Sequence, residues 1–126
     1  RPLPTALMDA GRARQVTRNL ISNAIKYTPQ GGHVVVSVSA NAKYVSLRVQ
    51  DDGVGIAEEA LARVWERSYR APQVPGEKRE PGQGLGLAIV RIIVEAHHGV
   101  KSLESQPGKG SVFTVGFPRA DQVWLR

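Results

Sequence analysis

The sequence has no cysteine, few aromatic residues and no long apolar run. Without cysteine, the chain forms no disulfide bonds and holds no zinc through thiolates. No apolar stretch approaches the roughly 18–20 residues that cross a bilayer as a helix. The chain has 126 residues, of which 41% are hydrophobic and 22% charged. This composition excludes a disordered or collagen-like chain and predicts one globular domain.

The chain carries more positively charged than negatively charged side chains. Lys and Arg number 17 against 11 Asp and Glu, which gives a net charge of +6. A basic surface attracts polyanions such as nucleic acid, acidic lipid or nucleotide phosphate, but it also simply keeps a domain soluble. No dense block of Lys and Arg occurs, and aromatic residues make up only 6%. Since stacking aromatics are typical of single-strand binding surfaces, we expect no direct contact with nucleic acid.

Hydrophobic periodicity predicts helices and strand pairs that alternate along the chain. The expected elements are helices over residues 9–28, 58–67 and 84–97, and strands over residues 33–40, 44–50, 101–106 and 111–117. Two antiparallel strand pairs with helices between them predict an α+β fold. We expect a two-layer sandwich, with a mixed, mostly antiparallel sheet and helices packed on one face.

Residues 70–84 interrupt this pattern. They contain three prolines, three glycines and five charged side chains, with no apolar period. A loop of this length inside a small domain is usually a lid or a binding loop. We therefore expect a long lid that is mobile in the absence of a ligand.

Three polar residues fall on one side of the first expected helix. At about 100° per residue, Asn19, Asn23 and Lys26 lie within roughly 60° of one another, beside the apolar face. Asparagine is a poor residue for a helix interior because its side chain competes for backbone hydrogen bonds. An amide oxygen suits Mg²⁺, and a lysine suits phosphate. On spacing alone, the alternative is an ordinary solvated helix face.

A carboxylate ends the second expected strand. Counting by two from Val49 places Asp51 on the buried face of that strand. A buried carboxylate needs hydrogen-bond donors, and the amino group of a ligand is one candidate. Gly53 and Gly55 would let a ligand approach the backbone closely. The alternative is an aspartate that caps the 52–56 loop, a role that fits Asp52 better.

Glycines open the helix expected at residues 84–97. Gly82, Gly84 and Gly86 would expose backbone N–H groups at a helix N-terminus, which favours an anion. Their spacing is not the dinucleotide-binding fingerprint, and the chain has no Walker A sequence. Taken alone, the cluster also fits the plain end of a loop. Residues 107–110 are typical of a tight turn between the last two strands.

Together these segments resemble the catalytic ATP-binding domain of sensor histidine kinases, within the superfamily that includes gyrase-, Hsp90- and MutL-type ATPases. The similar segments are residues 19–28 (N box), 51–56 (G1 box), 64–70 (F box), 82–89 (G2 box) and 108–111 (the final glycine turn). The resemblance implies an enzyme, a protein histidine kinase of a two-component system. Such a domain binds ATP and Mg²⁺ and donates the γ-phosphate to a histidine on a separate dimerisation and phosphoacceptor domain.

The resemblance also implies roles for single residues. Asn23 would hold Mg²⁺, with Asn19 beside the metal and the phosphates. Asp51 would bond the adenine amino group, and Arg70 of the lid would face the γ-phosphate. The other nucleotide-binding residues would be Lys26 at a phosphate, Tyr27 lining the pocket, and Gly53, Gly55, Ile56, Gly82, Gly84, Leu85, Gly86 and Leu87.

The F box departs from the family pattern at two positions. Trp65 stands where phenylalanine is usual, and Ser68 stands where a second aromatic residue is common. An indole ring can anchor the lid to the core, whereas serine cannot pack in the same way.

None of the three histidines lies in a phosphoacceptor motif. His33 begins an expected strand, and His97 and His98 end an expected helix. We therefore expect residues 1–126 to be a single catalytic domain that lacks the phosphoacceptor hairpin, is monomeric alone and does not phosphorylate itself. The expected partners are that hairpin and, through it, a response regulator. The parent is expected to be a homodimeric receptor of a bacterial cell membrane with its kinase in the cytoplasm.

An ATP-driven clamp or chaperone module is the main alternative. Such a module uses the same nucleotide site but needs a hydrolytic glutamate early in the first helix. Residues 9–18 contain no glutamate, which argues against hydrolysis as the function.

Overall fold

The computed structural model describes residues 5, 6, 8–66 and 86–123. Four strands form one sheet in the order β1-β2-β4-β3. Their bounds are β1 Val34–Ala40, β2 Tyr44–Asp51, β3 Val100–Gln106 and β4 Gly110–Pro118. Each neighbouring pair runs antiparallel. We expected a mixed, mostly antiparallel sheet, and every pairing among these strands is antiparallel. Hairpins join β1 to β2 and β3 to β4, which makes these two pairs antiparallel.

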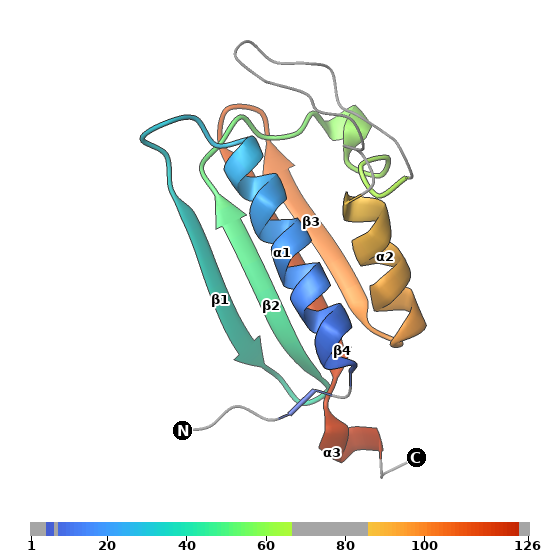
Figure 1. Cartoon of the computed structure of the whole chain (residues 1–126). Helices are drawn as coiled ribbons and strands as arrows, with labels where there is room; N and C mark the ends of the chain where they lie inside the picture. Colours follow the sequence, from blue (N-terminus) through green and yellow to red (C-terminus); the bar gives the residue numbers. More distant parts are fainter. Residues whose placement is uncertain (1–4, 7, 67–85, 124–126) are drawn as a thin grey trace.

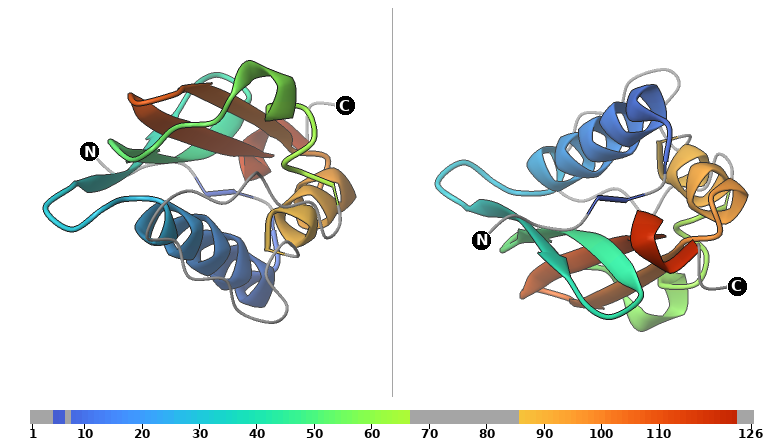
Figure 2. Two further views of the ribbon diagram at one scale, coloured as in Figure 1. Left: turned by 90° about the horizontal axis from the view of Figure 1, so that it is seen from above. Right: turned by 90° about the horizontal axis from the view of Figure 1, so that it is seen from below.

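Two helices cover one face of this sheet, so the expected α+β sandwich is confirmed. Helix α1 (Ala10–Lys26) lies over β2 and β4, and helix α2 (Gly86–Ala96) lies over the β3 side (Figures 1 and 2). The core between the layers comprises Val16, Leu20 and Ala24 of α1, Val90, Ile93 and Val94 of α2, and Val49, Phe113, Val115 and Phe117 of the sheet. Apolar residues at spacings of three and four on the helices and of two on the strands therefore meet as predicted.

Helix α1 begins and ends close to the predicted positions. The Asp9 carboxylate caps its start by accepting the backbone N–H of Arg12 at 2.9 Å. Its end lies at Lys26, before Pro29 and the Gly31–Gly32 pair. None of the helices in the described part of the chain combines the length and the hydrophobicity that a transmembrane span requires.

The helix expected over residues 58–67 is wrong. Only Glu58–Ala60 forms a short 3₁₀ helix, and hydrogen-bonded turns follow. Four backbone N–H groups here donate three residues back, whereas that of Val64 donates four residues back, to Ala60. A segment this short cannot offset the cost of helix nucleation by itself. Burial of the adjacent Val64 and Trp65 decides its path instead.

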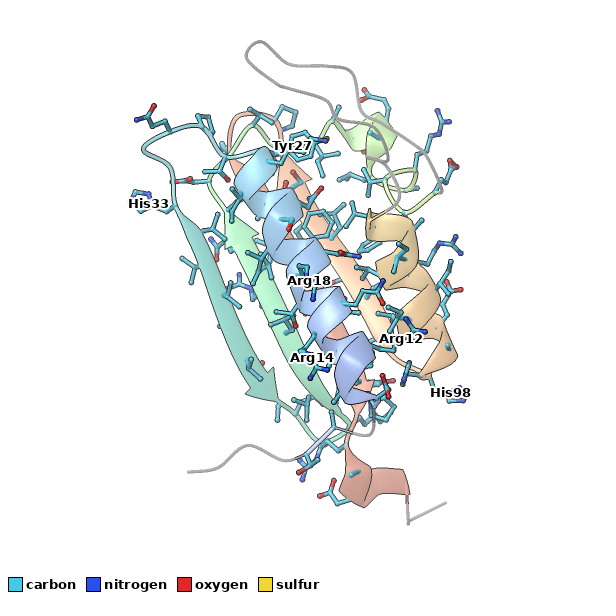
Figure 3. All side chains as sticks on the ribbon, viewed as in Figure 1. Arg12, Arg14, Arg18, Tyr27, His33 and His98 are labelled. Atoms are coloured by element: carbon cyan, nitrogen blue, oxygen red, sulfur yellow. The ribbon has the colours of Figure 1, made fainter. Side chains whose placement is uncertain are left out.

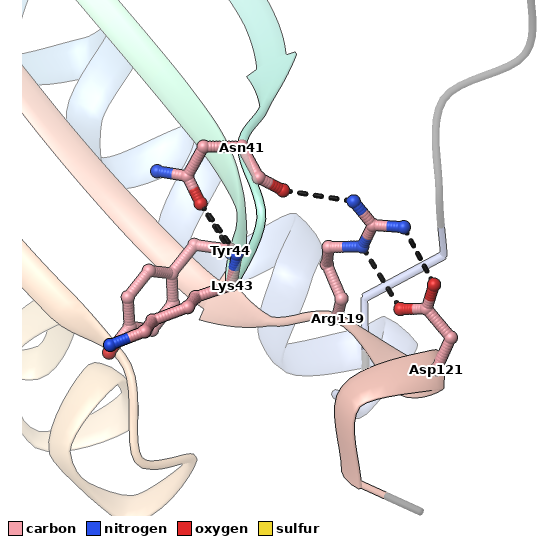
Figure 4. Close-up of polar contacts among 5 residues, drawn as sticks. All are labelled: Asn41, Lys43, Tyr44, Arg119 and Asp121. Carbon is pink, nitrogen blue, oxygen red and sulfur yellow. Dashed lines mark hydrogen bonds and ion pairs between the residues drawn. The ribbon is translucent and has the colours of Figure 1, made fainter. Parts of the chain in front are cut away.

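The hairpin of β1 and β2 is fastened at its turn (Figure 4). The side-chain oxygen of Asn41 accepts the N–H groups of Lys43 and Tyr44, both at 2.8 Å. The guanidinium of Arg119 donates to the Asn41 carbonyl at 2.9 Å and binds both oxygens of Asp121. Beyond β4, residues 120–123 form the short helix α3, and Ala6 pairs with Arg119 in an isolated bridge. The turn therefore stays closed although β1 itself is little buried.

Helix α2 ends on a residue in the left-handed conformation. His98 has φ 59°, the only positive φ among the described residues other than glycine. The N–H of Gly99 donates to the Val94 carbonyl at 2.8 Å, and that of His98 donates to the Glu95 carbonyl at 3.1 Å. This is the Schellman arrangement, in which glycine is usual at the position of His98.

We expect His98→Gly to stabilise the domain by about 1 kcal/mol, because glycine has no Cβ to oppose the left-handed conformation. Urea denaturation measures the change. His98→Ala serves as the control: it removes the imidazole but keeps the Cβ, so it should bring no gain. Equal stabilisation by both variants would attribute the effect to the ring and contradict the backbone explanation.

Candidate functional site

Four chain segments meet at one end of the sandwich. The C-terminal ends of α1 and β2 and the turn between β3 and β4 lie at the upper end of Figure 1, and α2 begins somewhat lower in the same half of the molecule. These segments carry the described residues of the N, G1 and G2 boxes and the final glycine turn. Motifs far apart in sequence are therefore gathered into one site.

Asp51 is the buried carboxylate of this site. It is 5% exposed, and it pairs with Val34 on one side and Ser111 on the other. One carboxylate oxygen accepts the N–H of Gly53 at 2.9 Å. Burial raises the pKa of Asp51, against the opposing effect of hydrogen bonds from the backbone of Gly53 and Ser111. Within the described residues no ion pair neutralises it, so it keeps acceptor capacity for a ligand.

Asp52 has a different role from its neighbour. Its side chain is exposed, and it accepts the backbone N–H of His33 at 2.7 Å. Its other oxygen lies 3.0 Å from His33 Nδ1. These hydrogen bonds lower the pKa of Asp52. The inward-facing position of Asp51 is therefore confirmed. The expectation that Asp52 caps the 52–56 loop is wrong: Asp52 holds His33 at the start of β1, and the loop N–H of Gly53 bonds to Asp51 instead.

The glycines of the 51–56 loop are explained by contacts within the chain. A Cβ on Gly53 would collide with the carbonyl oxygen of Tyr27, and a Cβ on Gly55 would collide with that of Gln106. Gly55 also has φ +75°, which favours glycine. We expected these glycines to admit a base and a ribose. Their visible function is to let the loop lie against α1 on one side and β3 on the other.

Sequence reasoning missed a pair of serines that joins this loop to the last hairpin. The hydroxyl of Ser105 accepts the Ile56 N–H at 2.8 Å and donates to the Gly110 carbonyl at 2.8 Å. It also lies 2.8 Å from the hydroxyl of Ser111. The sequence feature that could have identified Ser105 is its position two residues after Leu103, which places a polar side chain on the inward face of β3. Ser105 thereby positions Ile56, one of the predicted site residues.

The predicted residues of α1 lie at the same end. The Asn19 amide donates to the Gly86 carbonyl at 3.2 Å, which joins α1 to the start of α2. Lys26 Nζ lies 4.8 Å from the centre of the Tyr27 ring (labelled in Figure 3). The side chain of Asn23 has no hydrogen bond to another described residue, so its amide remains available to a ligand.

The other predicted residues divide into two groups. Leu87 packs partly buried against the core. Arg70, Gly82, Gly84 and Leu85 lie outside the described residues, as do Ser68 and the whole of the expected lid, residues 70–84. Among the described residues, no group of three His, Asp or Glu side chains is placed to hold a metal ion.

Trp65 is anchored in the core just before that undescribed segment. Its ring meets Phe113 edge to face, with centroids 5.6 Å apart. Arg91 Nε donates to its carbonyl at 3.1 Å, and Lys101 Nζ lies 5.1 Å from its ring centre. The indole therefore packs in the core as expected, and the lid that it was expected to anchor lies outside the described residues.

Comparison with known proteins agrees with this geometry. Residues 8–121 match the family described as histidine kinase-, DNA gyrase B- and HSP90-like ATPases. The chain belongs to this family. It is 39% identical over 119 residues to the sensor histidine kinase WalK of Bacillus subtilis, covering 91% of this chain and 19% of WalK. It is 39% identical over 109 residues to the heme sensor protein HssS of Staphylococcus saprophyticus, covering 86% of this chain and 23% of HssS.

Solved structures show the same fold. The mycobacterial sensor histidine kinase MprB matches with a TM-score of 0.77 and 29% identity, over 90% of this chain and 76% of that one. Full-length ShkA in complex with AMPPNP matches with a TM-score of 0.78 and 36% identity, over 94% of this chain and 24% of that one. The chain thus spans about a fifth to a quarter of WalK, HssS and full-length ShkA.

The burial of Asp51 predicts a pH-dependent stability. A carboxyl whose pKa is raised by folding costs stability as the pH rises from the unfolded value, 3.8, through the folded one. Asp51→Asn removes this ionisation and keeps an oxygen for the Gly53 N–H. Urea denaturation between about pH 3 and pH 7 should show the variant gaining stability relative to wild type as the pH rises. Parallel pH profiles would contradict the raised pKa.

Proposed function

We propose that this chain is the ATP-binding catalytic domain of a sensor histidine kinase. It binds ATP with Mg²⁺ and donates the γ-phosphoryl group to a histidine on a separate dimerisation and phosphoacceptor domain. The observation that carries this proposal is the buried, unneutralised Asp51 at the end of β2, beside the N box residues of α1. Family membership and the nucleotide analogue in the ShkA structure support it.

The base would bind at Asp51. Its carboxylate can only accept hydrogen bonds when ionised, and the exocyclic amino group of adenine is a donor. A charge-assisted hydrogen bond in a buried setting discriminates strongly against a base that presents an acceptor at that place. Tyr27, next to the same loop, would line the pocket, and Gly53, Gly55 and Ile56 would form its floor.

The phosphates would bind along α1 toward the start of α2. Asn23 offers an amide oxygen, the type of ligand that Mg²⁺ accepts alongside phosphate oxygens. Mg²⁺ bound there would offset the negative charge of the phosphates. Lys26 rests on an aromatic ring and not in an ion pair among the described residues, so its charge is available to a phosphate. Asn19 holds Gly86 in place, which positions the first N–H groups of α2.

The rest of the reaction depends on segments outside the described residues. We propose that Arg70 approaches the γ-phosphate and that Gly82, Gly84, Leu85, Gly86 and Leu87 form the nucleotide side of the lid. The acceptor histidine would belong to the parent's own phosphoacceptor hairpin, from which a response regulator receives the group. A homodimeric, membrane-anchored parent with its kinase in the cytoplasm is the setting we propose, with residues 1–126 as one catalytic domain that is monomeric alone.

Transfer of the γ-phosphoryl group to another side chain fits the site better than hydrolysis of ATP by water. Helix α1 carries no Asp or Glu within Ala10–Lys26, so no general base on that helix can activate water beside the phosphates. A clamp or chaperone ATPase needs such a group. The composition of α1 therefore favours a domain that passes phosphate to another side chain.

Asp51→Asn should lower ATP affinity about tenfold or more, since charge-assisted hydrogen bonds contribute about 1.5–3 kcal/mol. Titration calorimetry measures the change. Asp52→Asn is the matched control, because Asp52 faces His33 and not the pocket, and it should bind ATP like wild type. Unchanged affinity in Asp51→Asn, or an equal loss in both variants, would remove Asp51 from the base site.

Asn23→Ala should weaken Mg²⁺-dependent ATP binding by about tenfold and leave adenosine binding without metal nearly intact, because the amide is proposed to touch the ion and not the base. The neighbouring exposed residue supplies the control variant, Ser22→Ala. If adenosine and ATP lose affinity equally, Asn23 acts through folding and not through the metal.

The chain alone should bind Mg-ATP but not label itself. Phosphoryl transfer needs an acceptor positioned at the γ-phosphate. His97 and His98 lie beyond the far end of α2, whose 11 residues span about 16 Å at 1.5 Å each, and His33 is held by Asp52 beside the base end. Incubation with γ-labelled ATP tests this. Adding the parent's hairpin should produce acid-labile label on the hairpin, and stoichiometric label on His33, His97 or His98 would refute the donor role.

A further inference from the structure

Strand β1 is an edge strand without the usual protection against pairing. Its sequence, Val34–Ala40, contains only valine, serine and alanine. Natural edge strands carry charges, proline or bulges, or are covered by other segments, because an open edge attracts further strands. Here β1 pairs with β2 alone, its register runs without a bulge from Val34 to Ala40, and Figure 1 shows no described segment beside it.

The open edge presents a regular set of backbone groups. The His33 carbonyl accepts the Asp52 N–H, and the Asn41 N–H donates to the Tyr44 carbonyl. Because antiparallel bonding alternates, residues 35, 37 and 39 also bond to β2. The N–H and C=O groups of residues 34, 36, 38 and 40 therefore point away from β2 to the open edge. Only another extended chain satisfies such a row of alternating donors and acceptors.

Apolar side chains lie on the helix-facing side of this edge. Val36 and Val38 pair with Val49 and Leu47 of β2, yet they are 43% and 50% exposed, because the contact of α1 with β1 does not cover these two side chains. Ile25 of α1 is 62% exposed. We predicted one solvated face for this hairpin; its edge strand is exposed on both. A strand added to β1 would cover these residues.

Positive charge surrounds the edge. At about 100° per residue, Arg14 and Arg18 fall on the same side of α1 as Ile25, whereas Arg12 lies on the side toward α2 (Figure 3). On the other face of the sheet, Arg48 stands directly across from Ser37. No hydrogen bond or ion pair joins these three arginines to any residue of the described part. The small side chain of Ser37 leaves room for Arg48 to reach past β1.

We propose that β1 is a docking edge for an acidic, extended segment of a partner protein, which adds to the sheet as a fifth strand. Its backbone bonds to residues 34, 36, 38 and 40, its apolar side chains cover Val36, Val38 and Ile25, and its carboxylates meet the three arginines. A second copy of this chain fits poorly, since it would bring a second set of arginines and a second +6 charge to the same edge. A membrane surface or a nucleic acid could pair with the arginine charges, but it would leave the outward N–H and C=O groups of β1 without the regular partners that a strand supplies. This proposal does not depend on nucleotide binding.

Hydrogen exchange of the full chain tests the proposal. The probe is a nine-residue blocked peptide of alternating valine and glutamate, and its counterpart with lysine in place of glutamate is the control. At saturating glutamate peptide, the amides of residues 34, 36, 38 and 40 should gain protection, whereas those of 35, 37 and 39 should change little. The glutamate peptide should bind about tenfold tighter than the lysine peptide at low salt, and the difference should shrink as salt is added.

Two variants test the contributions of the β1 backbone and of the arginine charges to peptide binding separately. Val36→Pro removes an outward N–H and leaves the bonds to β2 intact, so it should abolish binding while ATP binding and protection at residues 35, 37 and 39 stay unchanged. The double variant Arg14→Glu and Arg18→Glu should reverse the preference between the two peptides. It leaves β1 untouched, so it remains informative even if the proline variant fails to fold.

Three results would overturn the proposal. The first is saturation by the glutamate peptide without the alternating gain in protection. The second is concentration-dependent protection of the same amides without peptide, which would identify a second copy as the occupant. The third is binding to vesicles of phosphatidylcholine and phosphatidylserine without binding of the glutamate peptide, which would identify a membrane surface.

Discussion

The structure depends on close backbone contact around the loop that follows β2. Gly53 lies against the Tyr27 carbonyl and Gly55 against the Gln106 carbonyl, so the loop is held between the end of α1 and the end of β3. Hydrogen bonds from Val54 to Tyr27 and from Gly108 to Val54, at 3.2 and 2.8 Å, fasten the same contacts. A side chain at either glycine would push the loop away from both neighbours. Asp51 then would lose the N–H of Gly53 and its fixed position, and the helix and sheet halves of the site would separate.

Asp51 and Asp52, the neighbouring carboxylates at the end of β2, have opposite effects on the stability of the fold. The pKa of Asp51 is raised by burial, so its charge opposes folding. The pKa of Asp52 is lowered by bonds to His33, so its charge supports the turn. A residue that costs stability but remains at a buried position is typical of a binding site, where a ligand supplies the missing partner. The pleat of β2 assigns these two roles, because neighbouring residues face opposite sides.

The sequence predicts those features that depend on period and local chemistry. Period two placed Asp51 inward, and Asp9 and Pro29 marked the ends of α1 within three residues. It does not predict features decided by neighbours distant in the chain. The segment after Glu58 follows the burial of Trp65 against Phe113 and not its own helical pattern. Ser105 becomes a site residue only because β3 brings it to Ile56. The exposure of Val36 and Val38 depends on how much of β1 is covered by α1. Hydrophobic periodicity does not predict this placement of the helix over the sheet.

Register also relates the proposed nucleotide site to the open edge. Val34 pairs with Asp51, so a strand added along β1 would end beside that carboxylate. Coupling between the two sites would require each ligand to bind one arrangement of Asp51 better than another, and the effect would be reciprocal. The loop after Asp51 is fixed by backbone contacts on both sides, and β1 already has its complete set of bonds to β2. Neither feature leaves a second arrangement for a docked strand to select. The geometry therefore favours independent binding at the two sites over allosteric coupling.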